Sequence, residues 1–401
     1  MRQYDKHGQL RRQIRQQDQP FVHDYRLSLD FDTPFPEADI GGAQVYAHSI
    51  NRGNRALIYE GVTRGWQLRT GEDLLSVDVP STKFRGYDVF MYWNGHTLAL
   101  ETANWGTSQS TGTITAVTSA SPPQITSTGH GLTDGDLIGI DDITGTIGTN
   151  TDRGLNDTFW TVLSVVDANN FTIDGADTTA LDYVAGGTFW KVNAPNTVEV
   201  LNGRLVKQDD PTRLLVGRGM TRETTGNSHT QFGPTQPTIY NEIASWLLEN
   251  IYNRRPITLR YGDLNNTWSW SGGAWRAGNN RAKLARTEFV NTVSMQEEQV
   301  LAQAWGIVRN DTDAPVVAIG IGLNTFLDNF ADVPKGGTTA PTVFVQLVSE
   351  LSQFPIASAA HGLHYFSWIE YGNPTVGTTT FAGDGGTTAQ LQTGLKARIW
   401  A

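Results

Sequence analysis

The chain has 401 residues, and its 30 Lys plus Arg against 40 Asp plus Glu give a formal net charge of −10. This acidic balance argues against nucleic-acid binding through bulk charge. The chain has no cysteine, which excludes disulfides, thiol nucleophiles and Cys-ligated metal sites. At about 100 to 200 residues per domain, the length allows two to four domains. The 42 glycines and the charged fraction of only 17% favour short strands and tight turns, so we expect a mainly β, multi-domain protein.

The first 20 residues form a basic N-terminal arm, in which Arg11, Arg12 and Arg15 concentrate positive charge. One interpretation is a docking peptide that anchors the protein by ordering on an acidic partner. The alternative is a solvated, mobile segment. The arm lacks the apolar centre of a signal peptide, and no apolar run in the chain reaches the roughly 18 residues of a membrane helix. We therefore expect assembly in a cytoplasm and no membrane insertion.

Short strands and glycine-rich turns dominate residues 21–109. Residues 25–31 alternate apolar and polar side chains, as a half-buried strand does. Residues 87–93 and 96–100 are apolar runs separated by Asn94-Gly95, which is the strongest short signal for a β-hairpin. We expect this region, together with residues 192–234, to form one β cassette.

A second block, residues 110–191, is rich in Thr, Gly and Asp and contains several hairpin signals. One of them runs from residues 159–166 through Asp167-Ala168-Asn169-Asn170 to residues 171–173. Residues 97–105 before the block and 198–216 after it read as neighbouring strands of one sheet. We interpret residues 110–191 as an inserted β module that interrupts the cassette.

Residues 235–256 are the one good helix candidate, because apolar residues recur mainly at spacings of three and four from Ile239 onward. Pro237 suits a first helical turn, and Pro256 ends the pattern. Ile243, Leu247 and Ile251 lie on the apolar face. That face either forms a seam between protein copies or packs on the protein's own sandwich.

Residues 257–401 return largely to strands, and we expect a C-terminal β-sandwich. In residues 363–371 large apolar side chains occupy both alternating faces, which is typical of a strand covered on both sides. Trp268, Trp270 and Trp275 flank a Gly272-Gly273 turn and are predicted to form an aromatic hairpin. Their indole rings suit stacking on sugars, although packing in a core or an interface is the more common role of such residues.

No motif for catalysis or cofactor binding assembles in the chain. A Gly-x-Ser-x-Gly elbow is missing, and no Gly-x-Gly has the third glycine and the helix that a dinucleotide site needs. The acidic residues Asp134, Asp136, Asp141 and Asp142 lack the order of a calcium loop, and we interpret them as solvated turn residues. We expect no catalytic residue, no metal and no cofactor.

Three phrases resemble a cassette that recurs in tail-fibre and other virion proteins of tailed bacteriophages. They are Tyr92-Trp93-Asn94-Gly95, residues 202–217 beginning Asn202-Gly203-Arg204, and residues 250–256 ending Arg254-Arg255-Pro256. The block 110–191, with Gly129-His130-Gly131-Leu132, is similar to a small β module first named in ubiquitin-activating enzymes and common as an insert in phage structural proteins. The resemblance implies no ubiquitin chemistry, because a catalytic Cys is lacking.

The resemblance implies a noncatalytic structural protein of a phage virion, a fibre or fibre-like appendage that is anchored by its N-terminus. It further implies a homotrimer, other virion proteins as partners and assembly in the host cytoplasm. One alternative is a carbohydrate-binding protein for host adhesion that uses the three tryptophans on surface glycans. A capsid or neck decoration protein and a polysaccharide hydrolase are the remaining alternatives.

Overall fold

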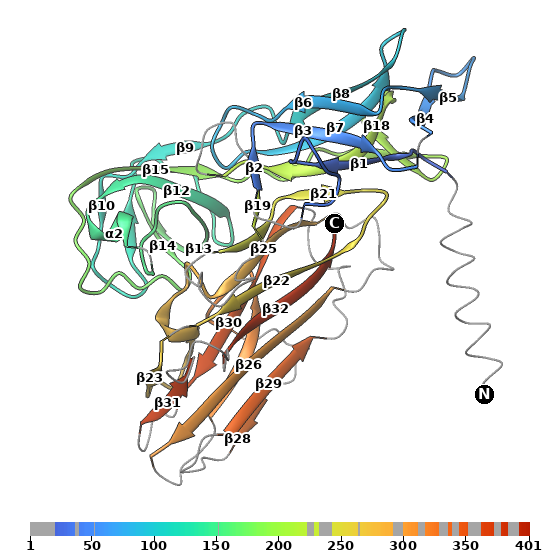
Figure 1. Ribbon diagram of the computed structural model, residues 1–401. Helices are drawn as coiled ribbons and strands as arrows, with labels where there is room; N and C mark the ends of the chain where they lie inside the picture. Colours follow the sequence, from blue (N-terminus) through green and yellow to red (C-terminus); the bar gives the residue numbers. More distant parts are fainter. Residues whose placement is uncertain are drawn as a thin grey trace, which may run out of the picture.

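The structure is a computed structural model of the chain. It describes residues 21–36, 40–51, 53–150, 152–222, 228–231, 243–263, 265–291, 300–311, 317–328, 336–338, 345–351, 362–372, 378–383 and 393–401. The predicted arm, with Arg11, Arg12 and Arg15, lies outside the described residues. The prediction of a mainly β protein is confirmed (Figure 1). Within the described ranges, no helix is long and apolar enough to span a membrane.

Two antiparallel sheets packed face to face form the N-terminal cassette, at the top of Figure 1. The smaller sheet has the order β1-β3-β6, with β1 at Tyr25–Ser28, β3 at Gln44–Ser49 and β6 at Leu74–Asp78. The larger has the order β16-β17-β18-β7-β8, with β21 added to β18; its strands are β7 (Gly86–Trp93), β8 (Leu98–Asn104), β16 (Val198–Leu201), β17 (Arg204–Lys207), β18 (Asp210–Met220) and β21 (Leu248–Asn250). Leu27 and Val45 of the first sheet and Val89 of the second meet in a buried core.

Two hairpins project from the cassette. The Asn94-Gly95 prediction is confirmed, since Trp93 pairs with Leu98 across the turn and Gly95 has a φ of 101° that favours glycine. The Asn94 side chain fixes the turn by accepting the backbone N–H groups of His96 and Thr97, both at 2.9 Å. The second hairpin is a separate two-stranded sheet of β4 (Arg55–Tyr59) and β5 (Trp66–Thr70).

Strands between Thr111 and Lys191 pair with one another in a sheet of the order β10-β11-β14-β13-β12-β15-β9. We call this segment the insert; its elements are β9 (Thr111–Thr113), β10 (Ala116–Val117), β11 (Gln124–Thr126), β12 (Leu137–Thr144), α2 (Thr146–Thr149), β13 (Thr158–Asp167), β14 (Asn170–Ile173) and β15 (Ala185–Lys191). The predicted turn at residues 167–170 joins β13 to β14. The chain leaves the cassette after β8 and returns at β16, so residues on both sides of the insert share one sheet.

A β-sandwich fills the lower part of Figure 1. One sheet has the order β2-β19-β20-β25-β30-β27-β28, with β24 added to β30; its strands are β2 (Ile40–Gly42), β19 (Ser228–Gln231), β20 (Ala244–Trp246), β24 (Trp275–Ala277), β25 (Arg286–Asn291), β27 (Val317–Leu323), β28 (Gly336–Thr338) and β30 (Gly362–Tyr371). The other has the order β22-β32-β26-β31-β23, with β29 added to β26; its strands are β22 (Pro256–Gly262), β23 (Thr267–Trp270), β26 (Leu301–Asn310), β29 (Val345–Leu351), β31 (Thr379–Ala382) and β32 (Gly394–Trp400). A 3-10 helix, η1 (Gly278–Asn280), follows β24.

The sandwich core lies between these sheets, where Phe366 and Trp368 of β30 face Leu259 and Leu395 of the other sheet. Nine of the ten residues of β30 are buried, which confirms the prediction of a strand covered on both sides. The opposite face of β30 packs on the insert, because Tyr365 and Ile369 belong to the insert's hydrophobic cluster.

The helix predicted over residues 235–256 is wrong for its described part. Ile243 lies directly before β20, Leu247 separates β20 from β21, and Ile251 follows β21. All three side chains are buried, but in three different clusters: Ile243 in the sandwich core, Leu247 between cassette, insert and sandwich, and Ile251 on the outer side of the large cassette sheet. Because this segment is covered on every side, most of its residues are apolar. Some of them then recur at spacings of three and four, which is the pattern of a helix. Residues 243–251 therefore offer no exposed apolar seam for oligomerisation.

Some segments pair with a sheet other than the one to which the sequence assigned them. β2 and β19 come from segments predicted to belong to the cassette, yet they extend the sandwich sheet beside β20. β21 follows β20 directly and pairs with β18 of the cassette. The predicted boundaries at residues 234 and 257 thus do not separate the two sets of sheets.

One buried ion pair lies inside the cassette, and a second joins the cassette to the sandwich. Arg218 Nε lies 2.8 Å from Asp88 Oδ1 inside the cassette, and Trp105 Nε1 donates to the same oxygen at 3.0 Å. Burial raises the pKa of Asp88, and the charge of Arg218 opposes that rise. Arg222 Nη1 joins the end of the cassette to Glu288 Oε2 of β25 at 3.0 Å. Removing one partner of such a buried pair costs about 3 to 5 kcal/mol, so the pairing of Arg222 with Glu288 ties the end of the cassette to the sandwich.

Candidate functional site

The predicted tryptophan hairpin is not a hairpin. β23, which carries Trp268 and Trp270, pairs with β31, whereas β24, which carries Trp275, pairs with β30 of the other sheet. The Gly272-Gly273 segment therefore carries the chain from one sheet of the sandwich to the other. Trp270 covers Gly272 so closely that a Cβ there would lie 2.0 Å from its ring. Gly272 leaves room for the Trp270 ring, and the Gly272-Gly273 segment does not connect two strands that pair with each other.

Trp268 is half-buried, and neighbouring side chains already pack against its ring. Its ring stacks on Phe381 with centroids 5.9 Å apart and an interplanar angle of 8°, and its plane is nearly perpendicular to that of Trp368, at 87°. Its Nε1 donates to Glu370 Oε2 at 2.8 Å. Burial raises the pKa of Glu370, while the neighbouring Arg276 lowers it. This arrangement is a satisfied polar network under a core aromatic residue.

Trp270 and Trp275 are also half-buried but belong to different surroundings. The Arg276 guanidinium lies over the Trp270 ring, 4.1 Å from its centroid, so one face of this indole is covered. Trp275 packs against Tyr371 at 5.5 Å and joins the cluster shared with the insert. The three tryptophans thus do not form one stacking platform. Sugar stacking by them remains a prediction.

Three of the four insert aspartates that were interpreted as solvated turn residues pair with lysines, and the fourth, Asp134, accepts the backbone N–H of Val165 at 2.6 Å. Lys191 Nζ lies 2.7 Å from Asp136 Oδ2, and Lys83 Nζ bridges Asp141 and Asp142 at 2.5 and 3.1 Å. Lys83 belongs to the cassette, so this pair also ties the insert to it. In the part of the chain that the structure describes, no three His, Asp or Glu side chains gather into a potential metal site.

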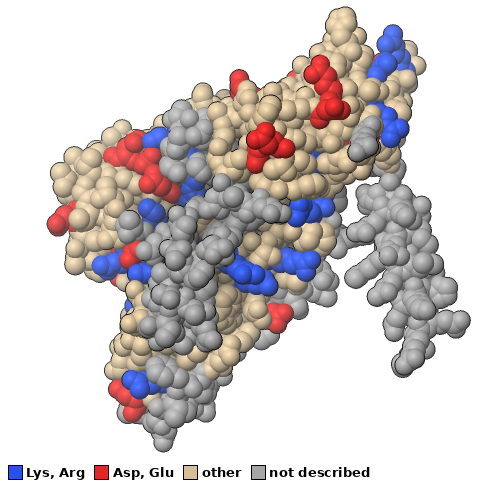
Figure 2. All heavy atoms as spheres, viewed as in Figure 1, with Lys and Arg blue, Asp and Glu red and all other residues tan. Residues whose placement is uncertain are grey.

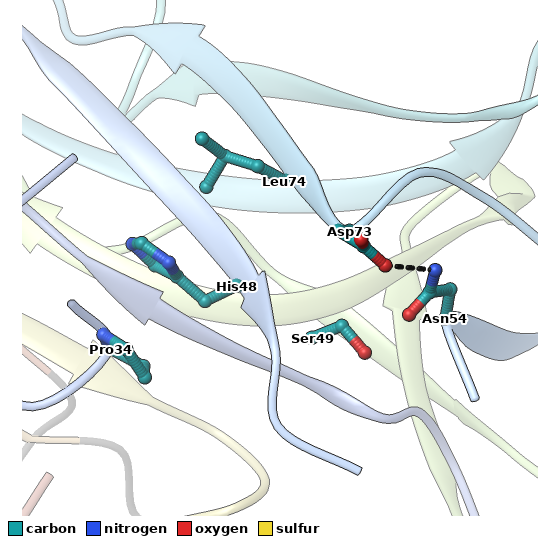
Figure 3. A pocket seen from close by; sticks show the side chains of 6 residues that line it. All are labelled: Pro34, His48, Ser49, Asn54, Asp73 and Leu74. Atoms are coloured by element: carbon teal, nitrogen blue, oxygen red, sulfur yellow. Dashed lines mark hydrogen bonds between the residues drawn. The ribbon is translucent and has the colours of Figure 1, made fainter. Parts of the chain in front are cut away.

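An open hollow of about 580 Å³ lies at one end of the small cassette sheet (Figure 3). Its lining comes from the loop after β1, the end of β3 and the starts of β4 and β6: Pro34, His48, Ser49, Asn54, Asp73 and Leu74. The volume falls within the roughly 300 to 1,000 Å³ of small-molecule sites. No motif in the sequence marks these six residues, because only the fold brings the four segments together.

Hydrogen bonds fix the walls of this hollow. Asn54 Nδ2 donates to Asp73 Oδ1 on one side, as Figure 3 shows. On the other side His48 Nε2 donates to the backbone oxygen of Asp30 at 2.7 Å and holds the loop with Pro34 against β3. Ser49 Oγ and Asn54 Oδ1 are buried and have no hydrogen-bond partner among the described residues. An unpaired buried oxygen costs about 1 to 3 kcal/mol, so a donor group that reaches these atoms is favoured.

Comparisons with known proteins do not identify a family. No family model matches this chain, and no curated protein matches it. Among solved structures, a chain of the "Structure of infectious bursal disease virus Gx strain" is similar with a TM-score of 0.21 and 10% identity, over 80% of this chain and 70% of that chain. A similarity of this size carries no argument about fold or function.

Proposed function

We propose that this protein is a noncatalytic structural subunit of a tailed-bacteriophage virion, in the form of a fibre or fibre-like appendage. The observation that carries the proposal is the joining of cassette, insert and sandwich into one body by shared strands and buried ion pairs. Arg222 and Glu288 connect cassette to sandwich, and the Arg286 guanidinium of β25 donates to the backbone oxygen of Phe159 in the insert at 2.6 Å. A rigid body of β modules suits a subunit that transmits or resists force.

The described side chains favour a structural role over a catalytic one. Among the described residues, the four fully buried carboxylates each lie beside an arginine inside the fold: Asp88, Asp263, Glu288 and Glu370. Carboxylates that perform acid-base chemistry on a substrate must reach it. The one carboxylate that lines the hollow, Asp73, accepts a hydrogen bond from Asn54.

Three-fold association remains part of this proposal, although residues 243–251 do not supply its seam. Light scattering of the purified protein should then give three times the 44.0 kDa chain mass. A monomer that persists at high protein concentration would contradict the fibre form.

Location on the particle is tested separately. An antibody against this chain should label the tail appendages of intact particles in negative-stain electron micrographs. Labelling of the capsid or neck would replace the fibre by a decoration protein, and the absence of the chain from purified particles would end the virion proposal.

Attachment to host surface glycans is the second candidate function, because Trp270 and Trp275 are partly exposed. Trp270→Ala and Trp275→Ala proteins should adsorb less to host cells while keeping the native circular dichroism spectrum. Unchanged adsorption of both variants would remove the tryptophans from this function.

A further inference from the structure

The hairpin of β4 and β5 has one face in the core and one face outside it. Cross-strand partners point to the same side of a sheet, and on one side Ala56 and Ile58 are buried in the cassette core. The other side carries four apolar residues in two neighbouring pairs: Leu57 with Leu68, and Tyr59 with Trp66. We call these four residues the hairpin stripe. Leu68 is 51% exposed, and the other three are half-buried.

Described neighbours cover the stripe only in part. The rings of Tyr59 and Trp66 contact each other with centroids 5.6 Å apart, and the Arg204 guanidinium lies over the Trp66 ring at 4.7 Å. Leu68, at the other end of the stripe, stays open to solvent. Burying contiguous apolar surface of this kind is favourable, so a segment that covers the stripe gains hydrophobic free energy.

The described chain begins beside this stripe. The backbone N–H of Leu57 donates to the Val22 oxygen at 2.8 Å, and residues 22–24 run along β4 as a neighbouring strand. Leu57 in turn pairs with Leu68 of β5. At about 4.8 Å between neighbouring strands, Val22 lies roughly 10 Å from Leu68. The segment that precedes Phe21 therefore starts within reach of the stripe.

Residues 1–20 lie outside the described residues, and their sequence complements this surface. Leu10 and Ile14 are four positions apart, a spacing that puts two apolar side chains on one side of a helical turn. Five Lys and Arg against two Asp give this segment +3 of a total of −10, so the rest of the chain carries −13. Figure 2 shows acidic side chains over the cassette, and Glu72 and Asp73 are exposed just after β5. Apolar contact and opposite charge thus favour the same surface.

The position of the segment in the chain favours its own body over a second copy. Ile14 and Phe21 are seven positions apart, and a chain of that length spans up to about 23 Å at 3.3 Å per residue. This reach exceeds the roughly 10 Å between Val22 and Leu68. A segment tethered so closely competes for the stripe at an effective concentration on the order of millimolar, which a separate molecule does not match in dilute solution.

We propose that the hairpin stripe is the docking site of residues 8–16 of the same chain. Leu10 and Ile14 pack on Leu57 and Leu68, and the basic side chains of the segment lie toward the acidic residues after β5. Anchoring of the protein through this segment then requires its release from the hairpin. The inference does not depend on the proposed virion role.

Cysteine cross-linking tests the contact in a chain that has no cysteine of its own. In the full-length protein, Ile14→Cys with Leu68→Cys should form an intramolecular disulfide under mild oxidation, at least fivefold faster than a control pair. The control joins Ile14→Cys to Val184→Cys, because Val184 is 70% exposed but belongs to the insert. Peptide mapping by mass spectrometry identifies the linked residues.

Hydrogen exchange gives a second readout. Removal of residues 2–20 should speed exchange of the β5 amides by about tenfold or more, whereas the amides of β30 in the sandwich should not change. Leu10→Asp with Ile14→Asp should have the same effect, since the added charges remove the apolar contact and keep the length of the segment. Circular dichroism should show the native fold in both proteins.

Two results would overturn the inference. A disulfide that forms only between two molecules, seen as a covalent dimer, would assign the stripe to the segment of a neighbouring copy. Cross-linking no faster than in the control, together with unchanged exchange in β5, would show that the segment does not dock there. Particle labelling could still support the virion proposal after either result, so the two proposals fail independently.

Discussion

His23 is buried at the start of the cassette, where its Nδ1 accepts the backbone N–H of Tyr25 at 3.1 Å. The ring meets Tyr252 edge-on at 5.3 Å, and its Nε2 has no hydrogen-bond partner among the described residues. Burial lowers the pKa of His23 from 6.5 to about 4. The native cassette therefore holds a neutral imidazole at a pH at which an unfolded chain already binds a proton.

This histidine predicts a loss of stability in acid. Between pH 6.5 and about 4 the unfolded state binds more protons at this position than the native state, so the free energy of unfolding falls as the pH falls. The full effect is about 3 kcal/mol, since each tenfold change in proton affinity corresponds to about 1.36 kcal/mol. His23→Asn keeps an acceptor for the Tyr25 N–H and should remove most of this dependence.

Urea unfolding at a series of pH values measures the effect. The exposed His96 offers the control, because His96→Asn should leave the unchanged protein's pH profile as it is. A His23→Asn protein that loses as much stability as the unchanged protein between pH 6.5 and 4 would show that His23 is not responsible.

At the scale of elements, close approaches between strands and loops decide how the insert sits on the cassette. Gly139 of β12 lies under Phe84, and a Cβ at Gly139 would come within 2.0 Å of the Phe84 ring. Phe84 itself is fully buried, has a φ of 52°, and packs edge-on against Phe159 of β13 at 5.0 Å. The Phe84 ring of the cassette thus occupies space that a side chain at position 139 of the insert would fill, so the packing requires glycine there.

Gly139→Val should destabilise the protein by about 1 to 3 kcal/mol through overpacking. Phe84→Ala should cost about 3 to 5 kcal/mol because it leaves a cavity. The double variant should lose clearly less than the sum, since the removed ring frees the space that the added side chain needs. A double-mutant cycle by urea unfolding measures this coupling, and strictly additive losses would refute the contact.

Elements with a local signal could be predicted from the sequence. Asn94-Gly95 specifies its hairpin through the φ that glycine permits, and the turn at residues 167–170 is likewise set by its own residues. Residues 243–251 could not be assigned, because their apolar pattern reflects three separate clusters that only the tertiary fold brings around them. The same holds for β23 and β24, whose partners β31 and β30 lie about 100 residues further along the chain.

The candidate sites also differ in how far the sequence could predict them. Trp268, Trp270 and Trp275 stood out by residue type alone, but their neighbours Phe381, Arg276 and Tyr371 decide how much of each ring is free. The residues that line the hollow gave no signal, since aspartates, amides and serines are ordinary in strand ends and loops. They lie together only because the fold brings four segments to one end of the small cassette sheet, where β3 pairs with β6.

At the scale of the whole molecule, the insert and the sandwich share a hydrophobic cluster. Phe326, Tyr365 and Ile369 of the sandwich are buried together with insert residues, and Thr161 donates to the backbone oxygen of Asn324 at 3.0 Å. The insert therefore covers apolar surface that the sandwich would otherwise expose to water.

Replacing residues 110–191 by a short Gly-Ser linker should lower the melting temperature and cause binding of a hydrophobic dye. The two ends of the insert are close, because Trp190 of β15 pairs with Thr111 of β9, so a linker can bridge them. The intact protein should unfold in one calorimetric transition, since the shared cluster couples the parts. Two separate transitions, together with an undisturbed deletion variant, would show that the insert is an independent appendage.

The guanidinium of Arg26 donates to the backbone oxygen of Ala401, 375 residues away, at 2.9 Å. During synthesis at about 5 to 20 residues per second, this arginine waits roughly 20 to 75 seconds for its partner to leave the ribosome. β2 likewise waits for β19 before it can join a sheet. β2 therefore keeps an unpaired edge until residues 228–231 have been synthesised, and over that interval a newly made chain needs protection from its neighbours on the same message.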